Sequence, residues 1–209
     1  MATEYPKLLS NITASLYKDV LKPRGFNKKG NTFNRVTSDG LIQVINFQAG
    51  RYEPWEEVNR LHGSFTVNLG IYIPEVAETS FEKKDFVNEY SCEIRTRLSR
   101  LSGNGEAWMS LKDFKEEDRL NLVQMLEQFG FPFLERFETR EKIIKNIDET
   151  KKNVVTPRPL VLLALIHCKQ GNAVKASELL KKQYDESSDH RGHQEYLIKL
   201  ADKMGIKIS

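Results

Sequence analysis

The sequence is poor in cysteine and has no long apolar run. Only two cysteines, Cys92 and Cys168, occur in 209 residues, which allows at most one disulfide and favours reduced thiols in a cytosolic protein. The longest apolar run covers residues 160–166, far short of the roughly 20 residues that a membrane-spanning helix needs. The N-terminal residues show no basic stretch followed by an apolar core, so we expect no signal peptide. These features predict a cytoplasmic protein without membrane insertion.

No block of charge of one sign is present either. Lys and Arg number 32 against 29 acidic residues, a net charge of +3, and the basic residues are dispersed along the chain. Nucleic-acid binding requires a basic stripe that neutralises phosphates. The pI of about 8.7 and Trp55 keep nucleic-acid binding as a third hypothesis, but the dispersed charge disfavours it.

The composition is that of a folded globular protein. Apolar residues make up 39% and charged residues 29% of the chain, enough apolar surface to build a core. A length of 209 residues fits one large domain or a domain with an appendage.

Helical and strand patterns alternate along the first half of the chain. Leu9, Ile12, Leu16 and Val20 recur at helical spacing, which predicts an amphipathic first helix that ends at residues 22–25. Turn residues at 29–31 and 38–40 then separate short segments rich in strand formers. Residues 41–48 are apolar on both faces, which predicts an interior strand. Residues 49–62 are predicted to form a long loop.

Two further strands are predicted by alternation of apolar and polar residues. In residues 63–74, Val67, Leu69, Ile71 and Ile73 face one way, and Asn68, Gly70 and Tyr72 the other. Residues 90–98 alternate in the same way and place Cys92 on the buried side. After Trp108 the period becomes helical again, with a predicted helix near residues 139–151.

The two prolines within residues 153–159 mark the predicted domain boundary. We expect an α+β domain over residues 1–152 and a helical C-terminal region over residues 153–209. The fold class is therefore α+β, with an antiparallel sheet of about five strands packed against the N-terminal and mid-chain helices. The tail is predicted to be a helical hairpin joined at Gly171-Asn172, followed by a last helix.

Three blocks resemble the bacterial family known as domain of unknown function 4304: LKPRGFNKKGNTFNR, GLIQVINFQ and FTVNLGIYIP. With the Trp108 region, the resemblance covers about residues 10–130. The family name implies no activity, and no catalytic residue can be transferred from it.

The tail separately resembles one tetratricopeptide-type helical hairpin. The bulky, small and turn residues that this pattern requires are Leu160, Leu163, Ala164, Gly171, Ala176 and Leu180. The pattern fails at Gln183 and Ser188, where a small residue and a proline are expected. Since stable arrays need about three repeats, an ordinary packed helix pair is the preferred interpretation.

The sequence offers no catalytic cysteine. A nucleophilic thiol needs a lowered pKa and a nearby base. Cys92 lies on the apolar side of its predicted strand, and His167 is poorly placed to activate Cys168 because adjacent helical residues point about 100° apart. Burial as small apolar residues is the better interpretation for both cysteines.

Metal and phosphate sites are also disfavoured. His190 and His193 have an HxxH spacing that suits a metal, but no third ligand is evident nearby, and a solvated helix start explains them better. Residues 103–105 are a glycine-rich turn without the lysine of a phosphate loop. The sequence therefore predicts no metal and no cofactor.

The polar face of the strand at residues 63–74 is the best candidate site. Gly70 lacks a side chain in mid-strand, which permits close approach of a ligand or another backbone. Strand pairing is expected to add amides and guanidinium groups, giving a concave patch for an anionic group. The predicted ligand-binding residues are Gln48, Asn68, Gly70, Tyr72, Arg95 and Arg97, and the alternative is a half-exposed sheet face partly covered by a helix.

The leading functional hypothesis is a non-catalytic protein-interaction protein, for example an immunity-type or partner-binding protein of a bacterial cytosol. It rests on the lack of a catalytic constellation, on the repeat-like tail and on analogy. The alternative is a small-ligand-binding protein or an enzyme that uses the face around Asn68, Tyr72, Arg95 and Arg97. A protein partner is expected, and no oligomeric state is predicted.

Overall fold

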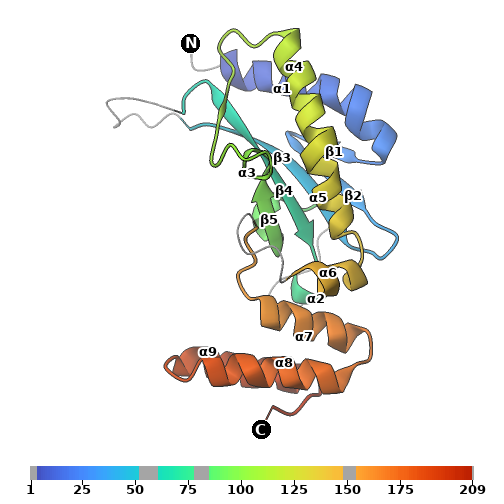
Figure 1. Cartoon of the computed structure of the whole chain (residues 1–209), viewed down its shortest axis with the longest axis vertical. Helices are drawn as coiled ribbons and strands as arrows, with labels where there is room; N and C mark the ends of the chain where they lie inside the picture. The colour runs from blue at the N-terminus through green and yellow to red at the C-terminus, as the bar shows by residue number, and fades with distance from the viewer. Residues whose placement is uncertain (1–3, 52–60, 78–84, 148–153, 209) are drawn as a thin grey trace. The chain divides into compact units, whose positions relative to one another are not determined.

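The chain forms two compact units, which we call the α+β unit and the helical unit (Figure 1). The computed structural model describes residues 4–51, 61–77, 85–147 and 154–208. The α+β unit comprises residues 1–72 and 84–155, and the helical unit comprises residues 73–83 and 156–209. The predicted boundary after residue 152 and most of the predicted loop at residues 49–62 lie outside the described residues.

The first helix, α1 (Glu4–Leu16), continues into a wider turn, η1 (Tyr17–Leu21), and a short 3₁₀ turn, η2 (Lys22–Arg24). Its apolar side chains at helical spacing are buried: Leu9, Ile12, Leu16 and Val20. The helical run stops at Gly25, whose φ of 81° lies in the left-handed region that glycine adopts readily. The predicted first helix is thus present with the predicted end.

Within the part of the chain that the structure describes, the sheet has six antiparallel strands. They are β1 (Asn27–Lys29), β2 (Thr32–Val36), β3 (Ile42–Ala49), β4 (Ser64–Tyr72), β5 (Ile94–Arg97) and β6 (Met109–Ser110). The spatial order is β1-β2-β3-β4-β5, and β6 also pairs with β4. Because β3 and β4 are paired on both sides, both strands are interior, as predicted for residues 41–48. The α+β fold class is confirmed.

One face of the sheet is apolar and is covered by helical segments. The ring of Phe47 lies 5.7 Å from that of Phe33 and 6.2 Å from that of Phe65. Tyr17 of η1 stacks on Phe33 at 5.9 Å, and Phe114 contacts Phe65 at 6.1 Å. This aromatic row spans β2, β3 and β4 and forms the centre of the core of the α+β unit.

The mid-chain helices follow the sheet. They are α3 (Leu98–Leu101), α4 (Glu116–Met125), η4 (Leu126–Gly130), α5 (Phe131–Arg136) and α6 (Arg140–Asn146). Helix α4 begins where the Lys115 amide donates to the Asp118 carboxylate at 2.8 Å, a side chain that caps the helix start. Thr139 accepts from the Lys142 amide at 3.2 Å and starts α6, close to the predicted residue 139.

The predicted strand at residues 90–98 is shorter than expected. Residues Glu89–Ser91 form a 3₁₀ turn, η3, and only Ile94–Arg97 form a strand. Tyr90 is 65% exposed, whereas Cys92 is buried. The alternation in this segment therefore came from a turn followed by a strand, which place side chains on alternate sides over a few residues.

The helical unit contains α2 (Pro74–Ala77), α7 (Pro159–Lys169), α8 (Ala173–Glu186) and α9 (Arg191–Lys203). Its core is a single cluster of Val161, Ala164, Leu165, Ala176, Leu180, Leu197, Leu200, Ala201 and Ile206. Gly171 turns the chain between α7 and α8 with φ of 79°, at the predicted joint. Among the described residues, every helix is too short or too polar to cross a bilayer.

Candidate functional site

The second face of the sheet is polar and carries a row of hydrogen-bonded amides. Asn46 on β3 donates from Nδ2 to Thr32 Oγ1 on β2 at 2.8 Å. Asn68 on β4 donates from Nδ2 to Asn46 Oδ1 at 3.3 Å and to Gln48 Oε1 at 3.0 Å. The register pairs Thr32 with Asn46 and Asn46 with Asn68, so the three share a face. The row fixes the orientation of the buried Asn68 amide.

Residues 87–92 cross part of this polar face and cover it. Asn34 Nδ2 donates to the Val87 carbonyl at 2.9 Å, and the Val87 amide donates to Asn34 Oδ1 at 2.6 Å. Farther along, Cys92 lies directly over Gly70, where a Cβ added to the glycine would be only 2.6 Å from Cys92 Sγ. The covered part is therefore closed to ligands, and the remaining polar surface lies around Asn68.

A cavity of about 270 Å³, which we call the arginine cavity, opens at the uncovered end of this face. It is small beside the roughly 300–1,000 Å³ of common ligand pockets, a size that suits a small molecule or a single side chain. The residues that line it come from β3, β4, η3, β5, α3 and two connecting segments: Gln48, Asn68, Leu69, Glu89, Arg95, Thr96, Arg97, Arg100, Glu106 and Val155.

Two of the three arginines in the cavity share one carboxylate. Arg97 Nη1 pairs with Glu106 Oε2, and Arg100 donates from Nε and Nη2 to Glu106 Oε1. The Arg97 guanidinium also lies 5.5 Å from the centroid of the Trp108 ring. All three charged side chains reach solvent, with exposed fractions of 28% for Arg97, 35% for Arg100 and 48% for Glu106.

Arg95 is held by its backbone and has spare donor capacity in its side chain. Its amide and carbonyl pair with Val155 at 3.0 Å and 2.7 Å, which fixes the strand edge. Nη1 makes a long hydrogen bond of 3.5 Å to the Tyr90 carbonyl. Nε is buried and has no hydrogen-bond partner among the described residues. Because Arg95 lines the cavity, its guanidinium can offer a terminal N–H to an acceptor there, and such charge-assisted hydrogen bonds are the stronger ones.

The structure brings together four of the six residues predicted to bind a ligand. Gln48, Asn68, Arg95 and Arg97 line one cavity, because the register places Asn68 opposite Arg97 and next to the β3 amides. Asn68 and Arg97 thus form the side of the cavity that strand pairing alone determines.

The other two predicted residues lie elsewhere. Gly70 is beneath Cys92, so its missing side chain makes room for the protein's own thiol side chain and not for a ligand. Tyr72 pairs with Ile42 in the register and is only 2% exposed. The alternative interpretation expected a helix to cover part of this sheet face. The segment that covers it, residues 87–92, includes only a short 3₁₀ turn.

Sequence reasoning missed Arg100, Glu106 and Glu89. Arg100 lies on the short helix α3, and Glu106 follows a turn in which Gly103 and Gly105 have φ of 84° and 62°. The Asn104 amide donates to the Ser99 carbonyl at 2.8 Å, which folds the turn back toward Arg97. The glycines at residues 103 and 105 signalled this turn, but they gave no direction for the chain that follows it.

Comparison with known proteins assigns a family to the region that contains the sheet. The family model described as Domain of unknown function (DUF4304) matches residues 17–136, more than half of the 209 residues. The chain belongs to this family. The DUF4304 region runs from η1 to the end of α5 and includes every lining residue of the arginine cavity except Val155. Neither the curated proteins nor the solved structures yield a significant match, and the tetratricopeptide resemblance of the tail is not confirmed.

The Gly70 to Cys92 contact within the DUF4304 region makes a testable prediction. Gly70→Ala is expected to lower the free energy of unfolding by about 1–3 kcal/mol, because the added Cβ overlaps the Cys92 side chain and pushes the segment of residues 87–92 away from β4. Thermal or urea unfolding measures the loss. Gly192→Ala is the matched control, since nothing lies within 4 Å of a Cβ there and alanine favours a helix. Equal stability of Gly70→Ala and the unchanged protein would contradict the close packing.

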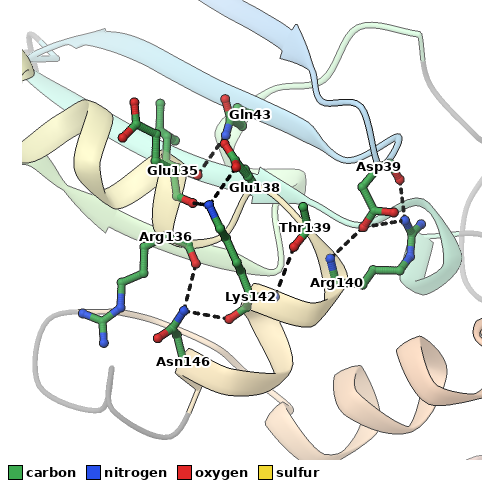
Figure 2. Close-up of polar contacts among 10 residues, drawn as sticks. Asp39, Gln43, Glu135, Arg136, Glu138, Thr139, Arg140, Lys142 and Asn146 are labelled. Atoms are coloured by element: carbon green, nitrogen blue, oxygen red, sulfur yellow. Dashed lines mark hydrogen bonds and ion pairs between the residues drawn. The ribbon is translucent and has the colours of Figure 1, made fainter.

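A second cavity, of about 350 Å³, lies between the β2–β3 hairpin and helices α5 and α6. Figure 2 shows its polar contacts: Gln43 Nε2 donates to the Leu134 carbonyl at 2.8 Å, and Lys142 Nζ reaches Glu138 at 2.7 Å. Burial lowers the pKa of Arg35 on this wall, against the opposing effect of Glu135 and Glu138. Two cations and two carboxylates thus balance in the cavity, which favours no ligand charge.

The hairpin turn beside this second cavity is fastened to α6. The Arg140 amide donates to Asp39 Oδ2 at 2.7 Å, and its guanidinium pairs with the same carboxylate and the Asp39 carbonyl (Figure 2). Asp39 therefore serves as a cap for α6 supplied from the β2–β3 turn. These contacts join the sheet to the mid-chain helices and give this region a structural role.

The cysteines and histidines do not form a reactive group. Burial raises the pKa of the Cys92 thiol well above its usual value, and Glu93 and Glu89 add to the effect. Burial lowers the pKa of His167, with a further contribution from Lys175. His193 stacks on Tyr196 at 5.8 Å. The described residues contain no group of three potential metal ligands.

Proposed function

We propose that this chain is a non-catalytic binding protein that captures a carboxylate- or phosphate-bearing ligand in the arginine cavity. The observation that carries the proposal is the convergence of Arg95, Arg97 and Arg100 on one cavity of about 270 Å³. Guanidinium groups present planar pairs of N–H donors that match the oxygens of carboxylates and phosphates. Among the lining residues that the structure describes, Glu89 and Glu106 are the acidic ones.

Binding is favoured over catalysis by the kinds of side chain present. General acid–base catalysis uses groups that titrate near the working pH, most often histidine. The lining residues that the structure describes include no histidine, cysteine or lysine, and the nearby Cys92 is a buried thiol with a raised pKa. The carboxylates of the described lining are those of Glu89 and Glu106, and Glu106 is paired with two arginines. The enzyme alternative would therefore have to use Glu89 or a reacting group that comes with the ligand.

In its finer form, the proposal places the chain in the bacterial cytosol as a partner-binding protein, an immunity-type role being one example. Both cysteines are free thiols, which fits a reducing compartment. The cavity has the size of a single anionic side chain, so the group that it takes can belong to a partner protein or to a small molecule.

The proposal predicts weak, charge-dependent binding of simple anions to the isolated protein. Two or three charge-assisted hydrogen bonds of about 1.5–3 kcal/mol each, reduced by the entropic cost of association, correspond to a Kd of about 1 mM. Isothermal titration and two-dimensional NMR with glutarate, inorganic phosphate and a short polyglutamate peptide measure it. Arg97→Gln is expected to weaken binding about tenfold, which corresponds to about 1.4 kcal/mol.

The control removes the same charge from a residue of the helical unit that does not line the cavity. Arg191→Gln breaks an exposed ion pair with Glu195 on α9, and it should leave the Kd unchanged. Added salt should weaken binding to the unchanged protein, because the cavity is open to solvent. Saturable binding that is equally strong in Arg97→Gln, or shifts confined to residues outside the cavity, would contradict the proposed site.

A further inference from the structure

Glu106 occupies the position that a bound carboxylate would take. Its two oxygens divide between two guanidinium groups, Oε2 toward Arg97 and Oε1 toward Arg100. Arg100 contributes both Nε and Nη2, and both reach the same oxygen, Oε1. Charge-assisted contacts of this kind are stronger than hydrogen bonds between neutral groups. The chain therefore supplies an anionic group of its own to the cavity that Arg95, Arg97 and Arg100 line.

The turn that carries Glu106 is exposed and is fastened at few points. The Ser99 hydroxyl donates to the Gly105 carbonyl at 2.8 Å, and the Asn104 amide donates to the Ser99 carbonyl at 2.8 Å. Residues 103–107 are otherwise exposed, and Gly103 and Gly105 allow changes in backbone angle that other residues resist. The carboxylate can therefore leave the arginines while the rest of the turn stays attached.

The ion pairs of Glu106 are weak enough to be exchanged for those of a ligand. All three partners are partly solvent-exposed, and exposed ion pairs contribute little net stability because water competes for the same charges. Arg95 also lines the cavity, and its Nη1 makes only a long hydrogen bond of 3.5 Å to the Tyr90 carbonyl. A ligand carboxylate that engages this guanidinium would gain a hydrogen bond that Glu106 is not observed to make. Competition between the two therefore favours a ligand that contacts all three arginines.

We infer that Glu106 is an internal competitor of the ligand, and that the ligand group is a carboxylate. The inference rests on the proposed function of the cavity and adds both the ligand class and its regulation. A planar carboxylate is selected because the Arg97 and Arg100 side chains are already arranged around one. Binding replaces Glu106 at the arginines and leaves its carboxylate in solvent, while the hydrogen bonds to Ser99 keep the turn at residues 102–106 attached.

The test removes the competing charge while keeping the shape of the side chain. Glu106→Gln is expected to bind glutarate about tenfold more tightly than the unchanged protein, because no internal carboxylate has to be displaced. Glu195→Gln is the matched control, since it removes an exposed, arginine-paired carboxylate from α9. The double variant Glu106→Gln with Arg97→Gln should lose the gain.

Four probes separate the sources of the ligand group and the possible outcomes. Glutarate represents a free dicarboxylate, a polyglutamate peptide represents an acidic segment of a partner, inorganic phosphate tests the anion class, and chloride tests charge alone. A gain in Glu106→Gln for glutarate or the peptide that exceeds the gain for phosphate supports the inference. The stronger of these two responses identifies the source.

The failure of the inference is distinguishable from that of the proposed function. If the unchanged protein and Glu106→Gln bind glutarate with equal affinity through Arg97, the cavity is a binding site and the internal competitor is overturned. A larger gain for phosphate than for glutarate overturns the ligand class. If neither protein binds any probe, both the proposed function and the inference are overturned. Thermal unfolding of each variant shows whether the fold is intact.

Discussion

Phe47→Ala is expected to lower the free energy of unfolding of the α+β unit by about 3–5 kcal/mol, the range for removal of a buried phenylalanine. Phe47 is 1% exposed and lies at the centre of the aromatic row between Phe33 and Phe65. Its removal leaves a cavity between two rings that belong to different strands, and the surrounding structure relaxes only partly to fill such a cavity.

Urea unfolding followed by tryptophan fluorescence measures this loss. Trp108 adjoins β6 and contacts Arg97 within the same unit, so its emission reports the unfolding of the sheet. Val36→Ala on the neighbouring strand is the control, because Val36 is 63% exposed and exposed substitutions usually change stability by less than about 0.5 kcal/mol. A loss below about 1 kcal/mol for Phe47→Ala would contradict the central place of this row.

The parts of the fold that sequence predicted depend on local signals. The turns near Gly30 and Gly40 have positive φ in the structure, which is the property that made them recognisable as hairpin turns. The strands β3 and β4 follow from runs of alternating or continuous apolar residues, and α1 follows from its helical period. Each of these signals is complete within about ten residues of the chain.

The predictions that were wrong concern segments whose conformation depends on contacts with distant parts of the chain. The strand predicted at residues 90–98 begins only at Ile94, because residues 87–92 pack across the polar face and Cys92 fills the space above Gly70. Alternation of side chains does not distinguish a strand from a turn that enters one. The same packing removes Gly70 and Tyr72 from the candidate site.

The residues of the candidate site also fall into those that the sequence could predict and those that it could not. Register alone places Asn68 opposite Arg97, so the amide and guanidinium pair followed from the predicted strands. The contributions of Arg100 and Glu106 depend on the path of the turn at residues 102–106, which no periodic pattern specifies. The charge balance of the cavity, and with it the inferred competition, became visible only when that path was known.

Asn34 holds residues 87–92, the covering segment, on the polar face of the sheet with both ends of its side-chain amide. Nδ2 donates to the Val87 carbonyl and Oδ1 accepts from the Val87 amide, and Asn34 and Val87 are 4% and 0% exposed. One side chain thus satisfies both polar groups of a buried residue that lies outside any strand. The segment continues to Glu89, which lines the arginine cavity.

Asn34→Ala is accordingly expected to lower the free energy of unfolding by about 2–5 kcal/mol, because it leaves two buried backbone groups without partners at about 1–3 kcal/mol each. Asn34→Asp keeps an acceptor for the Val87 amide but places a carboxylate against the Val87 carbonyl, so it should lose nearly as much. Hydrogen exchange at the Val87 amide should accelerate in both variants.

The control for this pair of variants is Asn27→Ala. Asn27 lies directly opposite Asn34 in the register of β1 and β2 but is exposed, so it should change stability by less than about 0.5 kcal/mol. If Asn34→Ala were as stable as Asn27→Ala and the Val87 amide stayed protected, the covering segment would be held by the packing of Val87 and Cys92 alone. In that case the cavity would owe its shape to apolar contacts, and its anion affinity should be unchanged in Asn34→Ala.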